Sequence, residues 1–384
     1  MKNNKRTWRR FLLAGLAATV LCTGVNLIDM QAAQAKVKFD VFDFEGHRGG
    51  RDARPENTLI SFAYGMEMGE TTLEMDMQMT KDGHIVISHN PFMSPNLAKG
   101  PDGKYVKAGQ YDIRTMTLAQ VKQFDIGTMN PAAGDYYEGH GKTQISVPGT
   151  KMPTLEEVFE LANSYGNDKV IFNIETKSYA DPLDPGYKNN PDPAVFVKTV
   201  NDIVKKYHME DRVTLQSFDW RTLKEMKKIN PNITLVALSS EQESWGRQEG
   251  CYLKLFDKNP SPWLGGLNIH DYNGDYVKAA HAIGADIVSP YWEELSPQLV
   301  SEAHTLGMKV VPWTVNSPQS MGMLIDMGVD GIISDKPWVL KDVLTKRGFE
   351  LRQPTVNIAS PYHTGTDVNN VETKKLANGG DASI

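Results

Sequence analysis

Two acidic residues, Glu74 and Asp76, stand two positions apart inside the apolar stretch 72–77. In a β-strand, residues two apart project from the same face, so both carboxylates would point into the interior of a barrel. Burying two unpaired carboxylates together costs free energy, which a bound cation would offset. Glu175, with Lys177 two residues later, repeats the pattern at the end of another apolar stretch. Three hard oxygen ligands favour one divalent cation, Ca²⁺ or Mg²⁺, over zinc.

The alternative is that these acids are salt-bridged residues of the surface. A surface position is disfavoured by the apolar neighbours of these acids, Leu73, Met75, Ile171, Phe172 and Ile174. The prediction is therefore a buried metal site.

Candidate acid–base groups lie at the ends of apolar stretches. His47 and Arg48 close the first stretch, and His89 closes a short one that follows residues 72–77. If these two stretches form a hairpin, His89 faces Glu74 or Met75. Two histidines flanking the carboxylates would suit a reaction in which one removes a proton and the other delivers one.

Apolar runs and amphipathic segments alternate from Phe44 onward, a pattern typical of parallel strands joined by helices. It predicts an α/β fold with a TIM-type (β/α)8 barrel over residues 36–347. The candidate strands are 44–48, 72–77, 85–89, 170–177, 213–218, 233–238, 286–290, 310–315 and 331–334. The candidate helices are 154–165, 193–207, 220–230, 275–283, 297–306 and 318–327.

Nine strands are one too many for an eight-stranded barrel. Residues 85–89 are the expected extra strand, because the turn at 80–83 leaves no room for the crossover that parallel pairing requires. The competing fold is a doubly wound sheet. It would favour a glycine-rich phosphate loop after the first strand, and residues 46–50 lack that spacing.

Three segments depart from the alternation. Residues 91–153 are rich in Gly, Pro, Tyr and Lys, with only 117–124 looking helical, and are too long for an ordinary barrel loop. They predict an inserted subdomain. A second irregular stretch, 240–273, contains Trp245, Cys251, Trp263 and His270. Residues 348–384 lose periodicity and end in a polar run, which predicts a loose tail.

The N-terminus has the pattern of a signal peptide. Five basic residues precede an apolar run over 11–28, and Ala33-Gln34-Ala35 has the small-x-small pattern of a cleavage site. We expect residues 1–35 to be removed and the protein to be exported, as a periplasmic or secreted protein without a stable membrane span. The alternative is a membrane anchor, since the run approaches the ~20 residues that a span needs.

Composition and charge narrow the possible partners. Hydrophobic residues make up 40% of the chain, which argues against global disorder. Removal of residues 1–35 would leave 36 basic and 46 acidic residues, and the net charge would change from −6 to −10. Such a protein has little attraction for nucleic acid. Loss of Cys22 would leave Cys251 alone, so no intrachain disulfide could form. The oligomeric state stays open.

Short motifs recur in order along the chain. They are His47-Arg48-Gly49, Pro55-Glu56-Asn57-Thr58, Glu74-x-Asp76, Thr80-x-Asp82-Gly83, His89, Asn173-Ile174-Glu175-x-Lys177, Gln216-Ser217-Phe218, Pro312-Trp313-Thr314-Val315-Asn316 and Asp330-Gly331-Ile332-Ile333-Ser334-Asp335. In this order the chain resembles the glycerophosphodiester phosphodiesterase family over residues 44–340.

The resemblance implies a TIM-type barrel with an insertion after the histidine that matches His89, which would account for residues 91–153. It also implies roles for individual side chains: a divalent metal held by Glu74, Asp76 and Glu175, an acid–base pair of His47 and His89, phosphate contacts from Arg48 and Lys177, and a glycerol wall at Trp313. Asp335 and Glu56 would be supporting residues. The chain departs from the family at Asn90, where members usually have Asp, so His89 would be a weaker base.

The reaction implied by the resemblance is hydrolysis of glycerophosphodiesters, small-molecule substrates, to glycerol 3-phosphate and an alcohol. One alternative is a phospholipase D-like phosphodiesterase acting on a lysophospholipid or wall polymer through a wider apolar mouth. A glycosidase is disfavoured, because two catalytic histidines and an arginine have no place in that mechanism. A non-enzymatic alternative is an exported Ca²⁺-binding protein.

Overall fold

A computed structural model of the protein describes residues 36–241 and 251–365. The predicted signal peptide, Trp245 and the end of the predicted tail lie outside these residues. The strands within the described ranges are β1 Asp43–Gly46, β2 Thr72–Met79, β3 Ile85–Ile87, β4 Ile171–Thr176, β5 Val213–Ser217, β6 Thr234–Ser239, β7 Ile287–Pro290, β8 Lys309–Val310 and β9 Gly331–Ser334.

Eight of these strands form a parallel sheet in the order β8-β7-β6-β5-β4-β2-β1-β9. The sheet curls into a barrel, which three backbone hydrogen bonds close between residues 330–333 and residues 310–315. The N–H of Asp330 donates to Val310 O at 2.8 Å, that of Ile333 to Pro312 O at 3.0 Å, and that of Val315 to Ile333 O at 3.0 Å. The structure therefore confirms the predicted (β/α)8 barrel.

The predicted strand 310–315 is shorter than expected. The parallel ladder with β7 ends at Val310, although the N–H of Val311 and of Trp313 still reach β7 carbonyls. Pro312 lacks an N–H and cannot continue the ladder, but its carbonyl helps to close the barrel on the other side.

β3 is the extra strand. It pairs antiparallel with β2, with Met77 opposite Ile87, Gln78 opposite Val86 and Met79 opposite Ile85. The hairpin prediction is thereby confirmed. The ladder ends before His89, which leaves the sheet where β2 reaches the end of the barrel.

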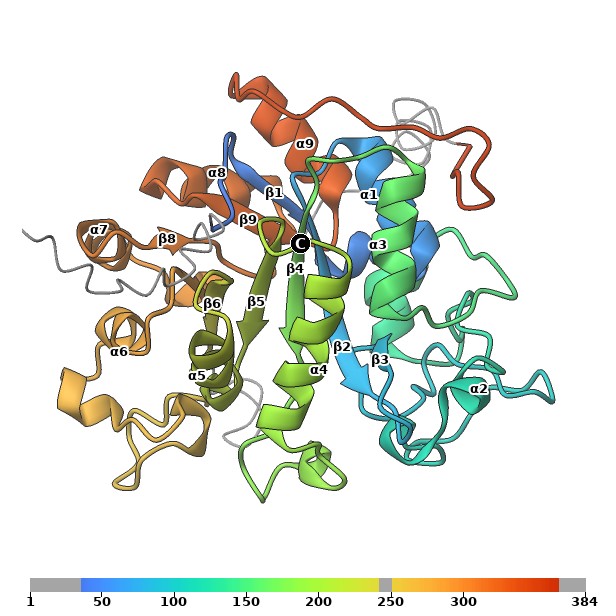
Figure 1. Ribbon diagram of the computed structural model, residues 1–384. Coiled ribbons are helices and arrows are strands. Elements are labelled where there is room, and N and C mark those ends of the chain that lie inside the picture. The colour runs from blue at the N-terminus through green and yellow to red at the C-terminus, as the bar shows by residue number, and fades with distance from the viewer. Residues whose placement is uncertain (1–35, 242–250, 366–384) are drawn as a thin grey trace, which may run out of the picture. The chain divides into compact units, whose positions relative to one another are not determined.

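Helices alternate with the strands and cover the outside of the barrel (Figure 1). They are α1 Leu59–Met68, α3 Leu155–Ser164, α4 Pro193–Lys206, α5 Trp220–Ile229, α6 Tyr276–Ala282, α7 Pro297–Thr305, α8 Pro318–Met327 and α9 Pro337–Lys346. A further short helix, α2 Leu118–Val121, lies within residues 91–153. The six predicted helices occur with ends within one residue of the predicted ones. Their first turns are capped by Thr, Asp or Ser side chains, as at Thr154 and Ser296.

Two helices, α1 and α9, were not predicted. Eight of the ten residues of α1 are buried, so its sequence shows little contrast between an apolar and a polar face. By contrast, α9 does bury a stripe that includes Leu340, Val343 and Leu344, a periodic signal that the prediction overlooked.

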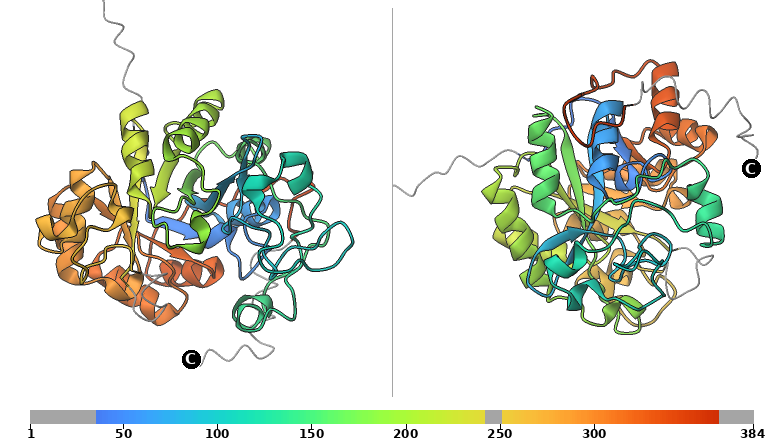
Figure 2. Two further views of the ribbon diagram at one scale, coloured as in Figure 1. Left: turned by 90° about the horizontal axis from the view of Figure 1, so that it is seen from below. Right: turned by 90° about the vertical axis from the view of Figure 1, so that its right-hand side faces the viewer.

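Residues 91–153 lie beside the ends of β2 and β3 (Figure 1) and flank one side of the barrel mouth when it is seen from below (Figure 2, left). They pack around a small apolar cluster that includes Met93, Ile113, Val121 and Phe124, separate from the main core. The described residues nevertheless belong to one compact unit. The description of 91–153 as a subdomain stays a prediction.

The first part of the predicted loose tail is packed. Residues 349–365 form no helix or strand, but the ring of Phe349 lies edge-on to Phe42 at 5.1 Å. The Arg352 guanidinium donates to the backbone carbonyl of Thr71 at 3.1 Å, and His363 lies 2.9 Å from the buried Glu67. This segment therefore lies against the barrel end opposite the mouth.

No helix among the described residues has the length and apolar character needed to cross a membrane.

Candidate active site

The turn after β1 directs two side chains to the mouth of the barrel. A 3₁₀ turn, His47–Gly49, follows β1 directly, and Arg48 adopts a left-handed conformation with φ of 53°. Gly49 follows at φ of 76°, and a Cβ there would lie 2.5 Å from the Ser61 hydroxyl. Only glycine fits this close approach, which holds His47 and Arg48 over the strand ends.

The three predicted acidic ligands meet in one buried cluster. Asp76 and Glu175 are register partners in the adjacent strands β2 and β4, and Glu74 lies on the same face of β2. One oxygen from each of the three carboxylates lies within 4.8 Å of the others, and all three residues are less than 10% exposed. The parallel register therefore brings together carboxylates that are about 100 residues apart in the chain.

Neighbouring donors hold two of the three carboxylates in place. Glu74 accepts hydrogen bonds from the backbone N–H of Arg48 at 2.7 Å and from the Gln216 side-chain amide at 2.7 Å. Asp76 accepts from Asn57 Nδ2 at 2.9 Å. Since a carboxylate offers about four lone-pair positions, each of these groups retains acceptor capacity for a cation.

The electrostatics of the cluster fit a bound cation. Desolvation, with the charges of Asp76 and Glu175 nearby, raises the pKa of Glu74 well above its usual value. Desolvation also raises the pKa of Glu175 to about 7, against the opposing charge of Lys177. Like charges that are buried together favour a counter-ion, and three oxygen donors suit a hard divalent cation.

Two cations flank the carboxylates. Arg48 Nη1 donates to Glu56 Oε1 at 2.9 Å, and Arg48 Nε lies 3.2 Å from Asp76 Oδ2. Lys177 Nζ lies 3.0 Å from Glu175 Oε1 and 3.8 Å from Asp76 Oδ1. Both cations line the cavity, so their remaining N–H groups can bind an anion there.

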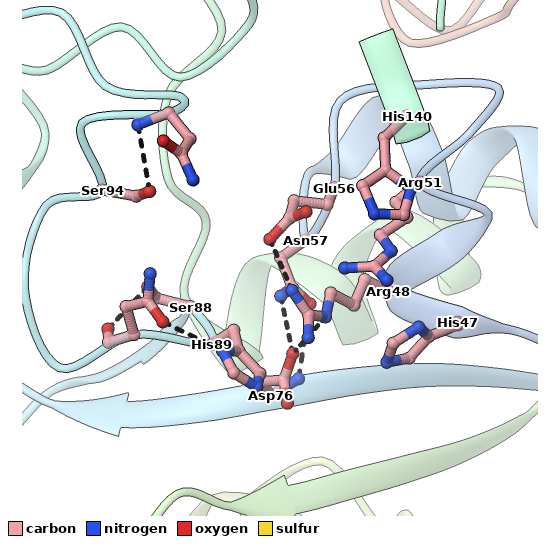
Figure 3. A network of polar contacts seen from close by, with 12 residues as sticks. His47, Arg48, Arg51, Glu56, Asn57, Asp76, Ser88, His89, Ser94 and His140 are labelled. Carbon is pink, nitrogen blue, oxygen red and sulfur yellow. Dashed lines mark hydrogen bonds and ion pairs between the residues drawn. The ribbon is translucent and has the colours of Figure 1, made fainter. Parts of the chain in front are cut away.

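The two histidines lie on opposite sides of Arg48 and Asp76 (Figure 3). His47 Nδ1 donates to Asp335 Oδ1 at 2.6 Å, and His89 Nδ1 donates to Asn90 Oδ1 at 3.0 Å. With Nδ1 protonated, each neutral ring carries its lone pair on Nε2. Both side chains line the cavity, where Nε2 can exchange a proton with a ligand.

The two rings differ in their electrostatic partners. Desolvation lowers the pKa of His47 to about 4 although the Asp335 carboxylate opposes this shift. Desolvation, Arg48 and Lys177 lower the pKa of His89 well below its usual value, and its direct partner is the neutral amide of Asn90. An imidazolium at His47 therefore has a hydrogen-bonded carboxylate partner, whereas at His89 the carboxylate of Asp76 raises the pKa without a hydrogen bond to the ring.

Aromatic side chains form another part of the cavity wall. The indole N–H of Trp313 donates to Ser289 O at 2.9 Å, which fixes its ring. Phe218 lies edge-on to Trp313 at 5.3 Å and stacks on Tyr252 at 4.2 Å. This wall can cover the apolar carbon atoms of a bound ligand.

All eight predicted site residues line one cavity of about 680 Å³. They are His47, Arg48, Glu74, Asp76, His89, Glu175, Lys177 and Trp313. The structure adds several residues that hold the site together: Arg51, Asn57, Tyr136, His140, Gln216 and Asn316. Asn57, Gln216 and Asn316 fall within the motifs quoted above, whereas Arg51, Tyr136 and His140 carry no signal in the sequence.

Asp335 supports the mouth through three neighbours. It accepts from His47 Nδ1, from Arg51 Nε at 2.6 Å and from Asn316 Nδ2 at 2.8 Å. Burial opposes its ionisation, but Arg51 and His47 outweigh burial and lower the pKa of Asp335 well below its usual value. Asp52, His140 and Asp335 lie close enough together that their ligand atoms could hold a second metal ion. Because the Asp335 oxygens already accept hydrogen bonds from Arg51, His47 and Asn316, we read this group as a hydrogen-bond network.

Comparison with known proteins agrees with this geometry. The model of the glycerophosphoryl diester phosphodiesterase family matches residues 47–339. A glycerophosphodiester phosphodiesterase from Caldanaerobacter subterraneus is 29% identical over 302 residues, which cover 79% of this chain and 97% of that protein.

Solved structures agree as well. A protein from Silicibacter pomeroyi, named provisionally as a glycerophosphoryl diester phosphodiesterase, is 28% identical with a TM-score of 0.68, and the match covers 82% of this chain and 97% of that one. A phosphodiesterase from Oleispira antarctica, solved with the product sn-glycerol-3-phosphate, is 20% identical with a TM-score of 0.56 and shares the fold, covering 79% of this chain and 97% of that one.

Proposed function

This chain belongs to the glycerophosphoryl diester phosphodiesterase family, and we propose that it hydrolyses glycerophosphodiesters to glycerol 3-phosphate and an alcohol. The observation that carries the proposal is the cavity in which two histidines flank a buried carboxylate cluster between Arg48 and Lys177. The product complex of the Oleispira antarctica phosphodiesterase supports a phosphate-bearing ligand for this fold.

Glu74, Asp76 and Glu175 would hold one divalent cation, Ca²⁺ or Mg²⁺. When bound, the cation would supply positive charge that stabilises the phosphoryl oxygens. Arg48 and Lys177 contribute two further positive charges from the chain itself. The guanidinium of Arg48 and the ammonium of Lys177 bind the non-bridging oxygens and are placed before the substrate arrives.

His89 is the proposed base of the first step. Its Nε2 takes the proton of the free glycerol hydroxyl, whose oxygen attacks phosphorus and forms a cyclic phosphate. Desolvation and the nearby charges of Arg48 and Lys177 lower the pKa of His89 and keep the ring uncharged, the form that accepts a proton. The bond between phosphorus and the alcohol oxygen breaks in the same step.

His47 is the proposed acid of that step. His47 acts in its imidazolium form, which the Asp335 carboxylate and the negative charge of a bound phosphodiester stabilise against desolvation, and its Nε2 gives a proton to the departing alcohol oxygen. In the second step water attacks phosphorus and opens the ring, with the roles of the histidines reversed. His47 then receives the proton of water, and His89 returns its proton to the glycerol oxygen.

One assay tests the activity and its mechanism together. The protein should release choline and glycerol 3-phosphate from glycerophosphocholine, and EDTA should abolish the release until Ca²⁺ or Mg²⁺ is restored. An analogue without the free glycerol hydroxyl next to the phosphate should not be cleaved. Absence of turnover at any metal concentration would favour the non-enzymatic alternative, and cleavage of the analogue would mean direct attack by water.

We also propose that the protein is exported after removal of residues 1–35, on the evidence of their sequence pattern. Cell fractionation followed by mass spectrometry of the N-terminus tests this proposal. The expected mature chain begins at Lys36, and a membrane-bound chain that retains residues 1–35 would contradict it.

A further inference from the structure

Within residues 91–153, one short segment, residues 136–145, contacts the loop that carries Arg51 and Glu56, and we call it the docking segment. It includes the helical turn Tyr137–Gly141 and runs along residues 51–56, the loop between β1 and α1. His140 Nδ1 donates to Asp52 Oδ1 at 2.6 Å, and Thr143 Oγ1 donates to Asp52 O at 2.7 Å. Gln144 Nε2 donates to Arg51 O at 2.7 Å. Side chains of the docking segment therefore hydrogen-bond to both a side chain and the backbone of this loop.

The first residue of the docking segment contacts the loop at Glu56. The Tyr136 hydroxyl donates to Glu56 Oε2, while Glu56 Oε1 accepts from Arg48 Nη1 at 2.9 Å. The Tyr136 ring also lies edge-on to His140 at 5.1 Å. Glu56 is buried, and each of its carboxylate oxygens thus has its own partner, a hydroxyl on one side and a guanidinium on the other.

We propose that Tyr136 is a positioning residue for Arg48 and acts through Glu56. The Tyr136 hydroxyl occupies Glu56 Oε2, so only Glu56 Oε1 accepts from the Arg48 guanidinium. The other N–H groups of Arg48 then remain available for phosphate oxygens. Without the hydroxyl, Oε2 would be a buried acceptor that lacks its donor. A carboxylate regains that bond most readily by pairing with both N–H groups of the guanidinium edge, which withdraws them from the phosphate.

This inference rests on the proposed function and gives residues 91–153 a defined role in it. The segment would hold the phosphate-binding arginine in the geometry that the reaction needs and would not itself touch the substrate through Tyr136. A purely structural role of Tyr136 would instead change the stability of the fold and leave anion binding unaltered.

The test removes the single hydroxyl and measures anion binding. In Tyr136→Phe we expect the dissociation constant of inorganic phosphate, measured by calorimetry with the same metal present, to rise about tenfold. That factor corresponds to ~1.4 kcal/mol, near the value of one hydrogen bond to a charged group. The KM for glycerophosphocholine should rise by a similar factor, with a smaller change in kcat.

Two further variants isolate the pathway. Tyr105→Phe makes the same chemical change within residues 91–153, where the hydroxyl donates to Met129 O at 3.1 Å, and should leave phosphate binding and KM unchanged. In an Arg48→Lys background, Tyr136→Phe should add less than a twofold effect, because lysine cannot form the paired contact.

The proposal is overturned if Tyr136→Phe weakens phosphate binding less than twofold, or by as much in the Arg48→Lys background as in the wild type. It is also overturned if Tyr105→Phe has the same effect, which would indicate general loosening. Phosphate binding needs no turnover. A wild-type protein that binds phosphate but does not cleave glycerophosphocholine would refute the proposed function and leave this inference standing.

Discussion

His47 Nδ1 donates a hydrogen bond to the Asp335 carboxylate at 2.6 Å, between residues that are 288 positions apart in the chain. The second histidine has no such partner, since His89 Nδ1 contacts the amide oxygen of Asn90 at 3.0 Å. The two imidazoles are therefore similar in position and different in charge environment. This asymmetry is the basis for assigning the acid of the first step to His47 and the base to His89.

Replacing either histidine should remove most of the activity. We expect His47→Ala and His89→Ala each to lower kcat with glycerophosphocholine by ~10²–10⁴, the usual effect of losing one general acid or base. With the p-nitrophenyl ester of glycerol 3-phosphate, whose leaving group needs no proton, only His47→Ala should recover. The exposed His281 provides the control, as His281→Ala should behave like the wild type. Recovery of His89→Ala instead would reverse the assignment.

Asn90→Asp tests the charge environment of His89. An aspartate at this position would stabilise the imidazolium and raise the pKa of His89. Because the first step needs the neutral ring, activity falls as pH drops through that pKa, so the acidic limb of the pH–rate profile should move to higher pH. Steady-state kinetics from pH 4 to 9 would measure the shift. An unmoved limb would mean that His89 is not the group that titrates there.

Glu175→Gln tests metal ligation. The amide keeps one oxygen ligand and loses its charge, so metal affinity should fall by at least the ~10- to 100-fold that loss of a residue supporting the ligands costs. Activity should be lost at ordinary metal concentrations and return in part at high ones, as titrations with Ca²⁺ and Mg²⁺ would show. Glu350→Gln, at an exposed position, is the control. Full activity of Glu175→Gln at low metal would mean that Glu175 is no ligand.

Glu70 should make stability depend on pH. It is buried, with Gly46 and Gly65 packed so closely that a Cβ at either would lie within 2.5 Å of its carboxylate, and desolvation raises its pKa to about 8. Between pH 5 and 8 the folded state keeps a proton that the unfolded state has lost, so stability falls as pH rises. Each unit by which the folded pKa exceeds the unfolded one amounts to ~1.4 kcal/mol.

Glu70→Gln carries no titrating group at this position. Its Tm, measured by calorimetry, should therefore change less between pH 5 and 8 than that of the wild type. Parallel Tm curves for the two proteins would show that Glu70 does not retain its proton in the folded state.

Local patterns in the chain were enough to predict most of the barrel. Alternation of apolar runs with amphipathic segments located the parallel strands and six helices. Each amphipathic element buries one face, and the spacing of its apolar residues shows which face that is. The short turn at 80–83 also marked β3 as an antiparallel addition, since chain length alone forbids a crossover there. The pattern failed at α1, which is buried on nearly all sides and therefore shows no periodic contrast.

The sequence by itself determined which residues could form the site, because the spacing of Glu74 and Asp76 in a strand puts both on one face. Only the tertiary structure decided what each of them contacts. Parallel register set Asp76 beside Glu175, and barrel closure brought Asp335 to His47. Tyr136 lies in an irregular segment whose sequence has no period, so its contact with Glu56 follows from packing between distant parts of the chain, which no local pattern encodes.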